Sequence, residues 1–308
     1  MKTMSKCKIG TKVHKERLNT EREILETVIN PFLNKIARFE EDDEEFRFFL
    51  EFIDGFPLYK CIWNFKDEAA FPEGITRFFA AQIVLAIEAL HSRGYMHRDV
   101  KSGNVLVSRA TGNATLIDFG LAKNVKDRTS SICGTHYIRA PEMFLDSSYE
   151  YTADWWSLGV VIFEMINGRP PWPYECVDGP ISYLSDIKQA IQAIKEGSYY
   201  GGKFAKMSHD GKNLLSRLLV INPSHRLGFS GAVEIKTHPW FKEIDWNLLE
   251  QGETRSSDAE APYNIDRDYQ DTGDPVRFLR LVNESDDQYA SSAESIDSDL
   301  NAKYFSDF

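Results

Sequence analysis

The sequence predicts an α+β protein of two lobes, with β-structure concentrated in residues 1–53 and mainly helical structure in residues 54–247. An aromatic run at 46–53 is typical of a strand, and apolar residues with helical spacing dominate beyond residue 74. From residue 248 onward Ser, Asp, Glu and Asn prevail, which indicates an extended acidic tail. The 308 residues are enough for one large domain or two lobes with a buried core.

Each element is predicted from a local pattern. Residues 17–29 are expected to form an amphipathic helix, because their apolar side chains recur on one face, namely Leu18, Ile24, Leu25 and Val28. The acidic run 40–45 is expected to be a solvated turn before the aromatic strand, which residues 54–57 end. Further helices are predicted at 74–93, 155–166 and 212–220, and short strands at 105–107 and 114–117, with Gly94 as a helix cap.

The charge is unevenly distributed along the chain. There are 36 Lys and Arg against 47 Asp and Glu, a net charge of −11. Residues 242–308 hold 17 acidic and 6 basic residues, so the 30 acidic and 30 basic residues before them balance. Such a chain lacks the basic excess that nucleic acids or anionic membranes require, and we expect it to bind neither.

The four cysteines are far apart and form no C-x-x-C pair: Cys7, Cys61, Cys133 and Cys176. They are expected to be reduced thiols of an intracellular protein, located in the cytoplasm and also able to enter the nucleus. We expect no signal segment and no membrane span, because no uninterrupted apolar run reaches about 18 residues. The apolar stretch 78–90 carries a Gln and a Glu and is typical of a core helix.

Three short motifs in the middle of the chain carry the strongest functional signal. H-R-D-x-K-x-x-N runs from His97 to Asn104, Asp118-Phe119-Gly120 begins fourteen residues later, and Ala140-Pro141-Glu142 follows. Two more motifs come after them in order, Asp154-Trp155-Trp156 and His225-Arg226-Leu227-Gly228. Together they resemble the catalytic loop, metal loop and activation-segment anchor of protein kinases. The resemblance implies a bilobal protein-kinase-like fold, with a β-rich N-lobe and a mainly helical C-lobe.

The residue types suit phosphoryl transfer. A carboxylate must orient the attacking hydroxyl and accept its proton, and Asp99 is the candidate. Lys101 can place a cation on the transferring phosphoryl group. Asn104 and Asp118 offer the hard oxygen ligands that Mg²⁺ requires. The predicted cofactors are therefore ATP and Mg²⁺.

Within the kinases the chain resembles the AGC group of serine/threonine kinases, and in that group the catalytic subunit of cAMP-dependent kinases. The segments that carry this resemblance are 79–85, 133–135, 140–142, 154–156 and 260–263. It implies a partial N-lobe at 1–53, a C-lobe at 54–247 and an AGC-type C-terminal tail at 248–308. The closing F-x-x-F implies that Phe305 and Phe308 dock onto the N-lobe.

The resemblance also implies roles for single residues. Lys2 would bind the ATP phosphates and pair with Glu21, nineteen residues later, and Thr135 would belong to the catalytic group. The nucleotide would further contact Glu51, Ile53 and Leu106. Structural support would come from an ion pair between Glu142 and Arg226 and from Asp154 bracing the catalytic loop.

Regulation and substrate choice are implied in the same way. An upstream kinase would phosphorylate Ser131, and the phosphate ligands would be Arg98, Lys123 and Arg17. Ser102-Gly103 stands where the group has Pro-Glu, and Pro57 replaces another acidic residue, while Glu164 is retained. A weak preference for basic protein substrates follows. Ser130 replaces an aromatic that contacts the regulatory subunit, so control by such a subunit is the weaker expectation.

The group's glycine-rich loop, G-x-G-x-x-G, does not precede Lys2 in this sequence. Three alternatives follow. The chain is an active serine/threonine kinase, a truncated kinase that turns over poorly and acts as a binding or scaffold protein, or an incomplete gene model of an active enzyme.

Overall fold

A computed structural model of the chain describes residues 1–8, 11–65, 70–126, 133–144, 149–173, 180–197, 199 and 202–252. Several predicted features lie outside this part: the whole tail from residue 253, with Phe305 and Phe308, and the phosphorylation candidate Ser131.

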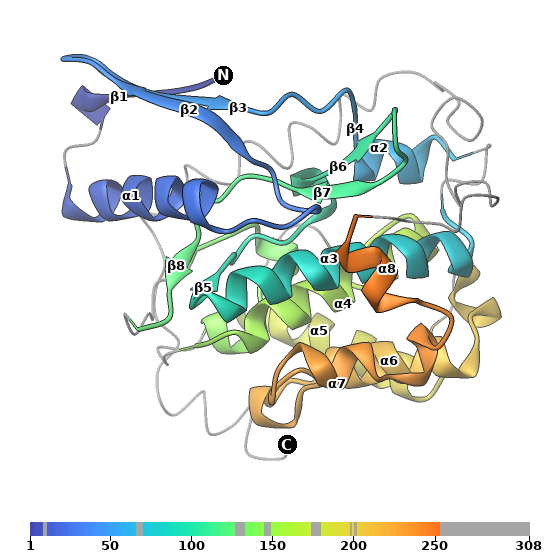
Figure 1. The fold of residues 1–308 in the computed structure, drawn as a ribbon. Helices are drawn as coiled ribbons and strands as arrows, with labels where there is room; N and C mark the ends of the chain where they lie inside the picture. Colours follow the sequence, from blue (N-terminus) through green and yellow to red (C-terminus); the bar gives the residue numbers. More distant parts are fainter. Residues whose placement is uncertain are drawn as a thin grey trace.

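The N-terminal part is an antiparallel three-stranded sheet with one helix against it (Figure 1). The strands are β1 (Lys2–Ser5), β2 (Ile36–Glu41) and β3 (Glu45–Leu50), in the order β1-β3-β2. Lys2 lies opposite Phe48, which is fully buried in the core below the sheet. The aromatic strand is thus confirmed, but it ends three residues earlier than expected.

The helix below this sheet, α1 (Lys12–Thr27), begins five residues before the predicted start. Its N-terminus is capped by the Thr11 hydroxyl, which accepts a hydrogen bond from the His14 N–H at 3.3 Å. The first turns are polar and carry no apolar periodicity, which is why the sequence pattern missed them. The predicted face is correct, and it buries Leu18, Glu21, Ile24 and Leu25.

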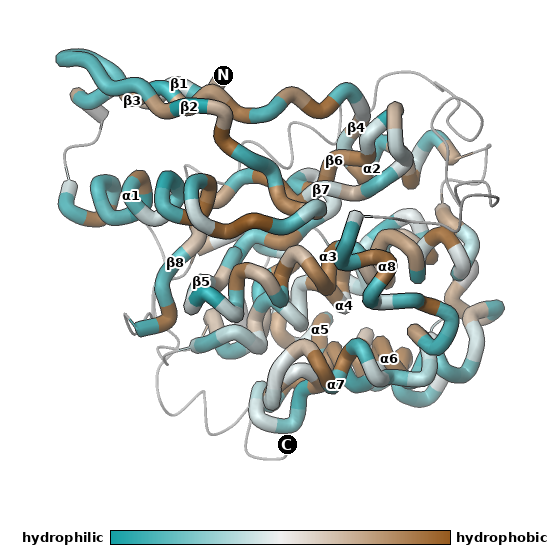
Figure 2. The backbone as a smooth tube through the Cα atoms, viewed as in Figure 1, coloured by the Kyte–Doolittle hydropathy of each residue, from teal (hydrophilic) through white to brown (hydrophobic). Residues whose placement is uncertain are grey.

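The remaining part is built around two long helices, α3 (Glu73–Ser92) and α4 (Thr152–Asn167). Both are apolar along much of their length (Figure 2), and α4 is buried from Thr152 to Ile166, with Trp155 and Trp156 near its N-terminal end. Gly94, one residue past the cap of α3, has φ +87°, a conformation that favours glycine. The other helices are α2 (Leu58–Trp63), α5 (Pro180–Lys195), α6 (His209–Leu218), α7 (Ala232–Lys236) and α8 (Trp246–Glu250).

Short strands position the loops between the two parts. The sheet β4-β6-β7 comprises Gly55–Pro57, Val105–Ser108 and Ala114–Leu116, and β5 (Tyr95–Met96) pairs with β8 (Lys123–Asn124). Short 3₁₀ helices lie at Lys6–Lys8, Ser102–Asn104, His136–Ile138, Pro141–Phe144, Gly202–Lys206, Pro223–His225 and Pro239–Phe241. The loop 97–104 follows β5 and leads to β6, and the loop 117–122 connects β7 to β8.

The α+β class with a small sheet region and a mostly helical remainder is confirmed. Among the described helices, α3 alone is long and apolar enough, by length and composition, to cross a membrane. However, 67% of the apolar window of α3 is buried inside the protein, as expected of a core helix. Of the described cysteines, Cys7 is exposed, whereas Cys61 and Cys133 are buried.

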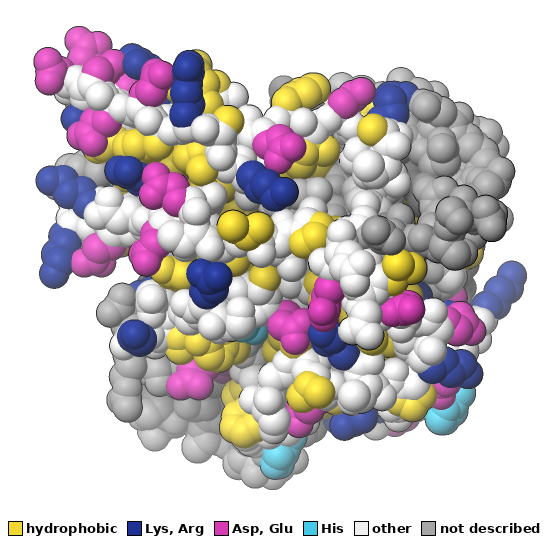
Figure 3. Space-filling view, in the orientation of Figure 1, with side chains coloured by type: hydrophobic (Ala, Val, Ile, Leu, Met, Phe, Trp, Pro, Cys, Tyr) yellow, Lys and Arg dark blue, Asp and Glu magenta, His cyan; other side chains and the backbone are white. Residues whose placement is uncertain are grey.

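The described surface carries charges of both signs. On the face drawn in Figure 3, Lys and Arg side chains alternate with Asp and Glu, and acidic side chains gather at the tip of the β2–β3 hairpin. Asp42 closes this hairpin by accepting hydrogen bonds from the Glu44 and Glu45 N–H groups, both at 2.8 Å. The predicted turn is therefore present at 42–44, whereas Glu40, Glu41 and Glu45 of the acidic run belong to β2 and β3.

Candidate active site

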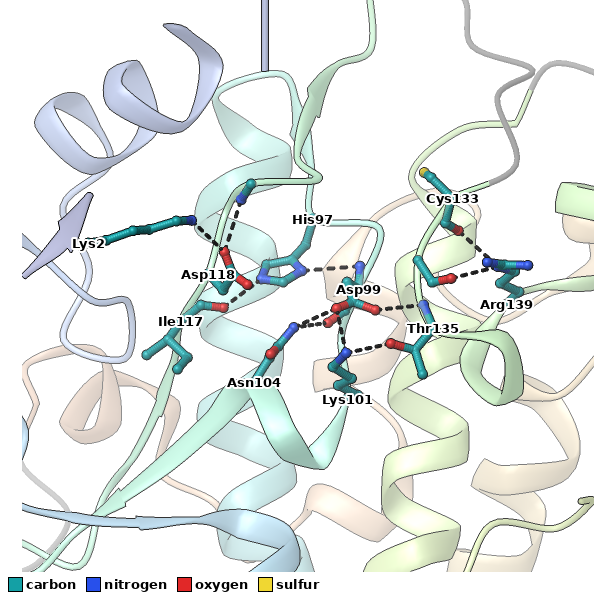
Figure 4. Close-up of polar contacts among 12 residues, drawn as sticks. Lys2, His97, Asp99, Lys101, Asn104, Ile117, Asp118, Cys133, Thr135 and Arg139 are labelled. Carbon is teal, nitrogen blue, oxygen red and sulfur yellow. Dashed lines mark hydrogen bonds and ion pairs between the residues drawn. The ribbon is translucent and has the colours of Figure 1, made fainter. Parts of the chain in front are cut away.

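Asp99 lies at the centre of a buried polar cluster on the loop that follows β5 (Figure 4). The Asn104 amide nitrogen donates to the Asp99 backbone carbonyl at 2.9 Å and to its Oδ2 at 2.7 Å. The Lys101 ammonium lies 3.0 Å from the same Oδ2, and the Thr135 N–H donates to Oδ1 at 2.9 Å. Asp99 is only 4% exposed, so these contacts hold its carboxylate in one orientation.

Lys101 and Thr135 connect the catalytic loop to the chain segment before the 3₁₀ turn at His136. Lys101 Nζ donates to Thr135 Oγ1 at 2.5 Å while it pairs with Asp99. The three residues predicted as catalytic thus form one mutually bonded group. A cation beside a carboxylate in a buried site is the arrangement that can orient a hydroxyl and stabilise a transferring phosphoryl group.

Lys2 forms a second cluster above the first. Its ammonium lies 2.7 Å from Glu21 Oε1 and 3.0 Å from Asp118 Oδ1. Glu21 is only 2% exposed on α1, whereas the Asp118 side chain is 51% exposed. The predicted Lys2–Glu21 contact is therefore present, while the contact to Asp118 was not predicted.

The charged groups of this cluster shift one another's pKa values. Burial lowers the pKa of Lys2, but the charges of Asp118 and Glu21 outweigh it, and the pKa stands above its ordinary value. Burial raises the pKa of Glu21, and Lys2 offsets only part of the rise. For Asp118, the effect of burial is outweighed by the charge of Lys2 and its hydrogen bond, so its pKa is lowered. Lys2 is therefore cationic and Asp118 anionic at neutral pH.

The backbone around these groups is strained, and one carboxylate supports it. Arg98 and Asp118 have φ of +68° and +62°, values that residues with side chains rarely adopt. Buried Asp154 accepts hydrogen bonds from the His97 and Arg98 N–H groups at 2.9 and 2.8 Å. Asp154 also contacts His91 Nε2 at 2.8 Å. Burial alone would raise the pKa of Asp154, but its bonded partners outweigh this effect and lower it.

His97 links the two loops, a role that the sequence patterns did not indicate. Its Nδ1 accepts the Asp99 N–H at 3.2 Å, so the proton lies on Nε2, which donates to the Ile117 carbonyl at 3.2 Å. These two hydrogen bonds of the His97 ring hold Ile117, the residue before Asp118, close to Asp99.

A buried ion pair anchors the lower part of the site. Arg226 donates to the two oxygens of Glu142 at 2.6 and 2.8 Å and to the Thr152 carbonyl at 2.9 Å. The Arg226 side chain is fully buried. The predicted contact is present, and its bidentate geometry restrains the chain beyond Ala140.

The remaining predicted residues lie around these clusters. Arg98 donates to the Leu121 carbonyl at 2.6 Å and to the Tyr149 hydroxyl at 3.2 Å. Arg17 borders a cavity of about 520 Å³ between β1 and α1, whose lining also includes Lys2, Glu21 and Gly120. The other positions are Lys123 in β8, Leu106 in β6, and Glu51 and Ile53 in the connection that follows β3.

The donor set suits Mg²⁺. Asp118 supplies an ionised, half-exposed carboxylate. The Asn104 amide nitrogen is bonded to Asp99, and the amide oxygen of the same side chain is a second hard donor. No group of three or more His, Cys, Asp or Glu residues that could hold a metal ion alone occurs in the described part. Mg²⁺ is typically bound by one or two carboxylates together with substrate phosphates, so the residues present fit this ion.

The comparison with known families decides the assignment. The model of the protein kinase domain matches residues 1–241. The chain belongs to the protein kinase family. The match includes both clusters of the kinase site and the buried Glu142–Arg226 pair, and it ends six residues before the predicted tail at 248–308.

Similar kinases include members of the group that the sequence motifs resemble. The chain is 36% identical over 261 residues to serine/threonine-protein kinase AtPK2/AtPK19 of Arabidopsis thaliana, covering 83% of this chain and 52% of that one. It is 32% identical over 253 residues to the cAMP-dependent protein kinase catalytic subunit of Dictyostelium discoideum, covering 82% and 37%. It is also 32% identical over 252 residues to cAMP-dependent protein kinase type 3 of Saccharomyces cerevisiae, covering 81% and 59%. The AGC resemblance is confirmed, and the chain matches roughly half the length of these relatives.

Proposed function

We propose that this chain is a serine/threonine kinase of the AGC type, which transfers the γ-phosphate of ATP to hydroxyl groups of protein substrates. The observation that carries the proposal is the bonded group of Asp99, Lys101 and Thr135 beside the Lys2–Asp118 pair. These side chains come from distant parts of the chain. Their convergence supplies a base, two cations and a metal-binding carboxylate in one site.

Each residue has one task in this proposal. Asp99 orients the substrate hydroxyl and takes its proton, while Lys101 offsets charge on the transferring group. Lys2, held by Glu21, contacts the ATP phosphates, and the connection with Glu51 and Ile53 contacts the adenine together with Leu106. Asp118 and Asn104 would hold Mg²⁺, which neutralises phosphate charge when bound.

A phosphate on Ser131, added by an upstream kinase, is proposed to order the activation segment. Support comes from Arg98, which directly precedes Asp99 in the chain and whose backbone N–H donates to Asp154 at 2.8 Å. A phosphate bonded to Arg98 would act on the residue next to the base. Ser131→Ala should lower activity, and phosphate at Ser131 should be detected by mass spectrometry of active protein. An unphosphorylated Ser131 in active protein, with unchanged activity of the variant, would contradict this part of the proposal.

Substrates are proposed to be proteins with a weak preference for basic sequences. Glu164, on α4, is the acidic residue retained from the group's pattern, and its carboxylate is fully buried with neither oxygen hydrogen-bonded. A substrate cation could pair with it only after reaching this buried position, which fits a weak preference. Regulation by a separate subunit and a cytoplasmic location stay predictions.

The function is tested by phosphate transfer from ATP to serine peptides, comparing the wild-type chain with Asp99→Asn. We expect transfer that requires Mg²⁺ and falls at least a hundredfold in the variant, since a positioned base contributes about 10²–10⁴-fold. Equal, background-level transfer by both proteins would instead favour the scaffold alternative.

A further inference from the structure

The segment 133–135 fixes the direction of the Asp99 carboxylate. The Thr135 N–H donates to Asp99 Oδ1 at 2.9 Å. The Thr135 hydroxyl accepts from Lys101 Nζ, which also lies 3.0 Å from Asp99 Oδ2. A shift of this segment would therefore disturb both oxygens of the reacting carboxylate.

The backbone of segment 133–135 packs directly on the catalytic loop. Gly134 has φ +84°, and a Cβ atom at this position would lie 2.4 Å from the Arg98 carbonyl oxygen. Arg98 itself has φ +68°. Conformations of this kind persist only where surrounding contacts enforce them.

Two side chains outside the catalytic motifs supply such contacts. Arg139 Nε donates to the Cys133 carbonyl at 3.1 Å and to the Gly134 carbonyl at 2.7 Å (Figure 4). The Tyr149 hydroxyl accepts from Arg98 Nη1 at 3.2 Å and lies 3.5 Å from Cys133 Sγ. Tyr149 is only 4% exposed, so it joins segment 133–135 to the catalytic loop inside the core.

We propose that Arg139 and Tyr149 are positioning residues of the phosphotransfer site, which hold segment 133–135 against the catalytic loop and thereby orient Asp99. The inference rests on the proposed kinase function. The single N–H of Arg139 Nε is shared between the Cys133 and Gly134 carbonyls in one bifurcated, charge-assisted hydrogen bond, and Tyr149 accepts another from a guanidinium. Both contacts lie on the Asp99 side of the site, away from the Lys2 cluster, so their loss affects the transfer step rather than the binding of ATP.

The kinetic test compares Tyr149→Phe and Arg139→Lys with a matched control, Tyr199→Phe. Arg139→Lys keeps the charge but loses the Nε geometry. The Tyr199 hydroxyl donates to the Pro171 carbonyl at 3.1 Å, so its removal also deletes one hydrogen bond of a tyrosine. We expect kcat to fall by about three- to tenfold in the two positioning variants, with the KM for ATP within about twofold of wild type. The control should keep its kcat even if its melting temperature falls equally.

A second readout does not depend on catalysis. Because the Thr135 N–H is bonded to Asp99, its hydrogen exchange should be about three- to tenfold faster in both positioning variants and unchanged in Tyr199→Phe. Unchanged kcat in both variants, or unchanged Thr135 exchange, overturns the proposal. Absence of transfer by the wild-type chain refutes the kinase function alone, and the exchange measurement still decides whether the segment is held in this way.

Discussion

Replacing Glu164 by Gln should change the pH dependence of stability. Glu164 lies on α4 with 0% exposure, and neither of its carboxylate oxygens is hydrogen-bonded. Burial raises its pKa from 4.5 to about 7, and the nearby Ser102 hydroxyl offsets only part of this rise. The folded protein therefore keeps a proton on Glu164 at pH values where the unfolded chain has released it.

The magnitude follows from this pKa difference. Between pH 4.5 and about 7 the folded state binds more protons than the unfolded state, so the free energy of unfolding falls as the pH rises. At about 1.4 kcal/mol per pH unit, Glu164 costs the folded state about 3 kcal/mol above pH 7. Gln cannot ionise, and the penalty for its unpaired amide is the same at every pH. The stability of Glu164→Gln relative to wild type should therefore rise by about 3 kcal/mol between pH 4.5 and pH 8.

Urea unfolding at a series of pH values, followed by tryptophan fluorescence, measures this difference. Glu16→Gln, at an exposed position of α1, serves as the control and should leave the difference from wild type nearly independent of pH. If the difference in free energy of unfolding between Glu164→Gln and wild type stays constant within about 0.5 kcal/mol over the whole pH range, the reasoning is refuted. Such a result would mean that burying the ionised carboxylate has no free-energy cost.

Three further predictions test other parts of the structure. Glu142→Ala should lower the free energy of unfolding by about 3–5 kcal/mol in urea titrations, because it leaves the buried Arg226 guanidinium without its carboxylate; a loss below about 1 kcal/mol would contradict a buried pair. Gly134→Ala should reduce activity more than tenfold with intact overall fold by circular dichroism, because its Cβ would meet the Arg98 carbonyl; wild-type kcat in this variant would show that the contact is not needed. Lys2→Met should weaken ATP binding in calorimetry by at least tenfold, because the phosphates lose their ammonium partner; unchanged affinity would remove Lys2 from the nucleotide site.

The sequence predicted elements that have strong local patterns. The helix 74–93 and the strand 46–53 were found within a few residues, because apolar periodicity and aromatic content mark them directly. β2 was missed because charged residues interrupt its alternation, and no helix was predicted in the segment that forms α5.

The candidate site divides in the same way. The contacts of Lys2 with Glu21 and of Glu142 with Arg226 could be predicted, because each residue belongs to a recognisable motif. The roles of Arg139 and Tyr149 could not, because they depend on carbonyl and hydroxyl contacts between segments that have no pattern in common. Such contacts can be identified only from the three-dimensional arrangement of the backbone, including that of the strained catalytic loop.

The most direct test of the central claim separates nucleotide binding from phosphate transfer in Asp99→Asn. If Asp99 is the base, the variant should bind Mg²⁺–ATP with wild-type affinity in calorimetry and lose at least a hundredfold in single-turnover transfer to a serine peptide. Transfer by Asp99→Asn at the wild-type rate would contradict the account.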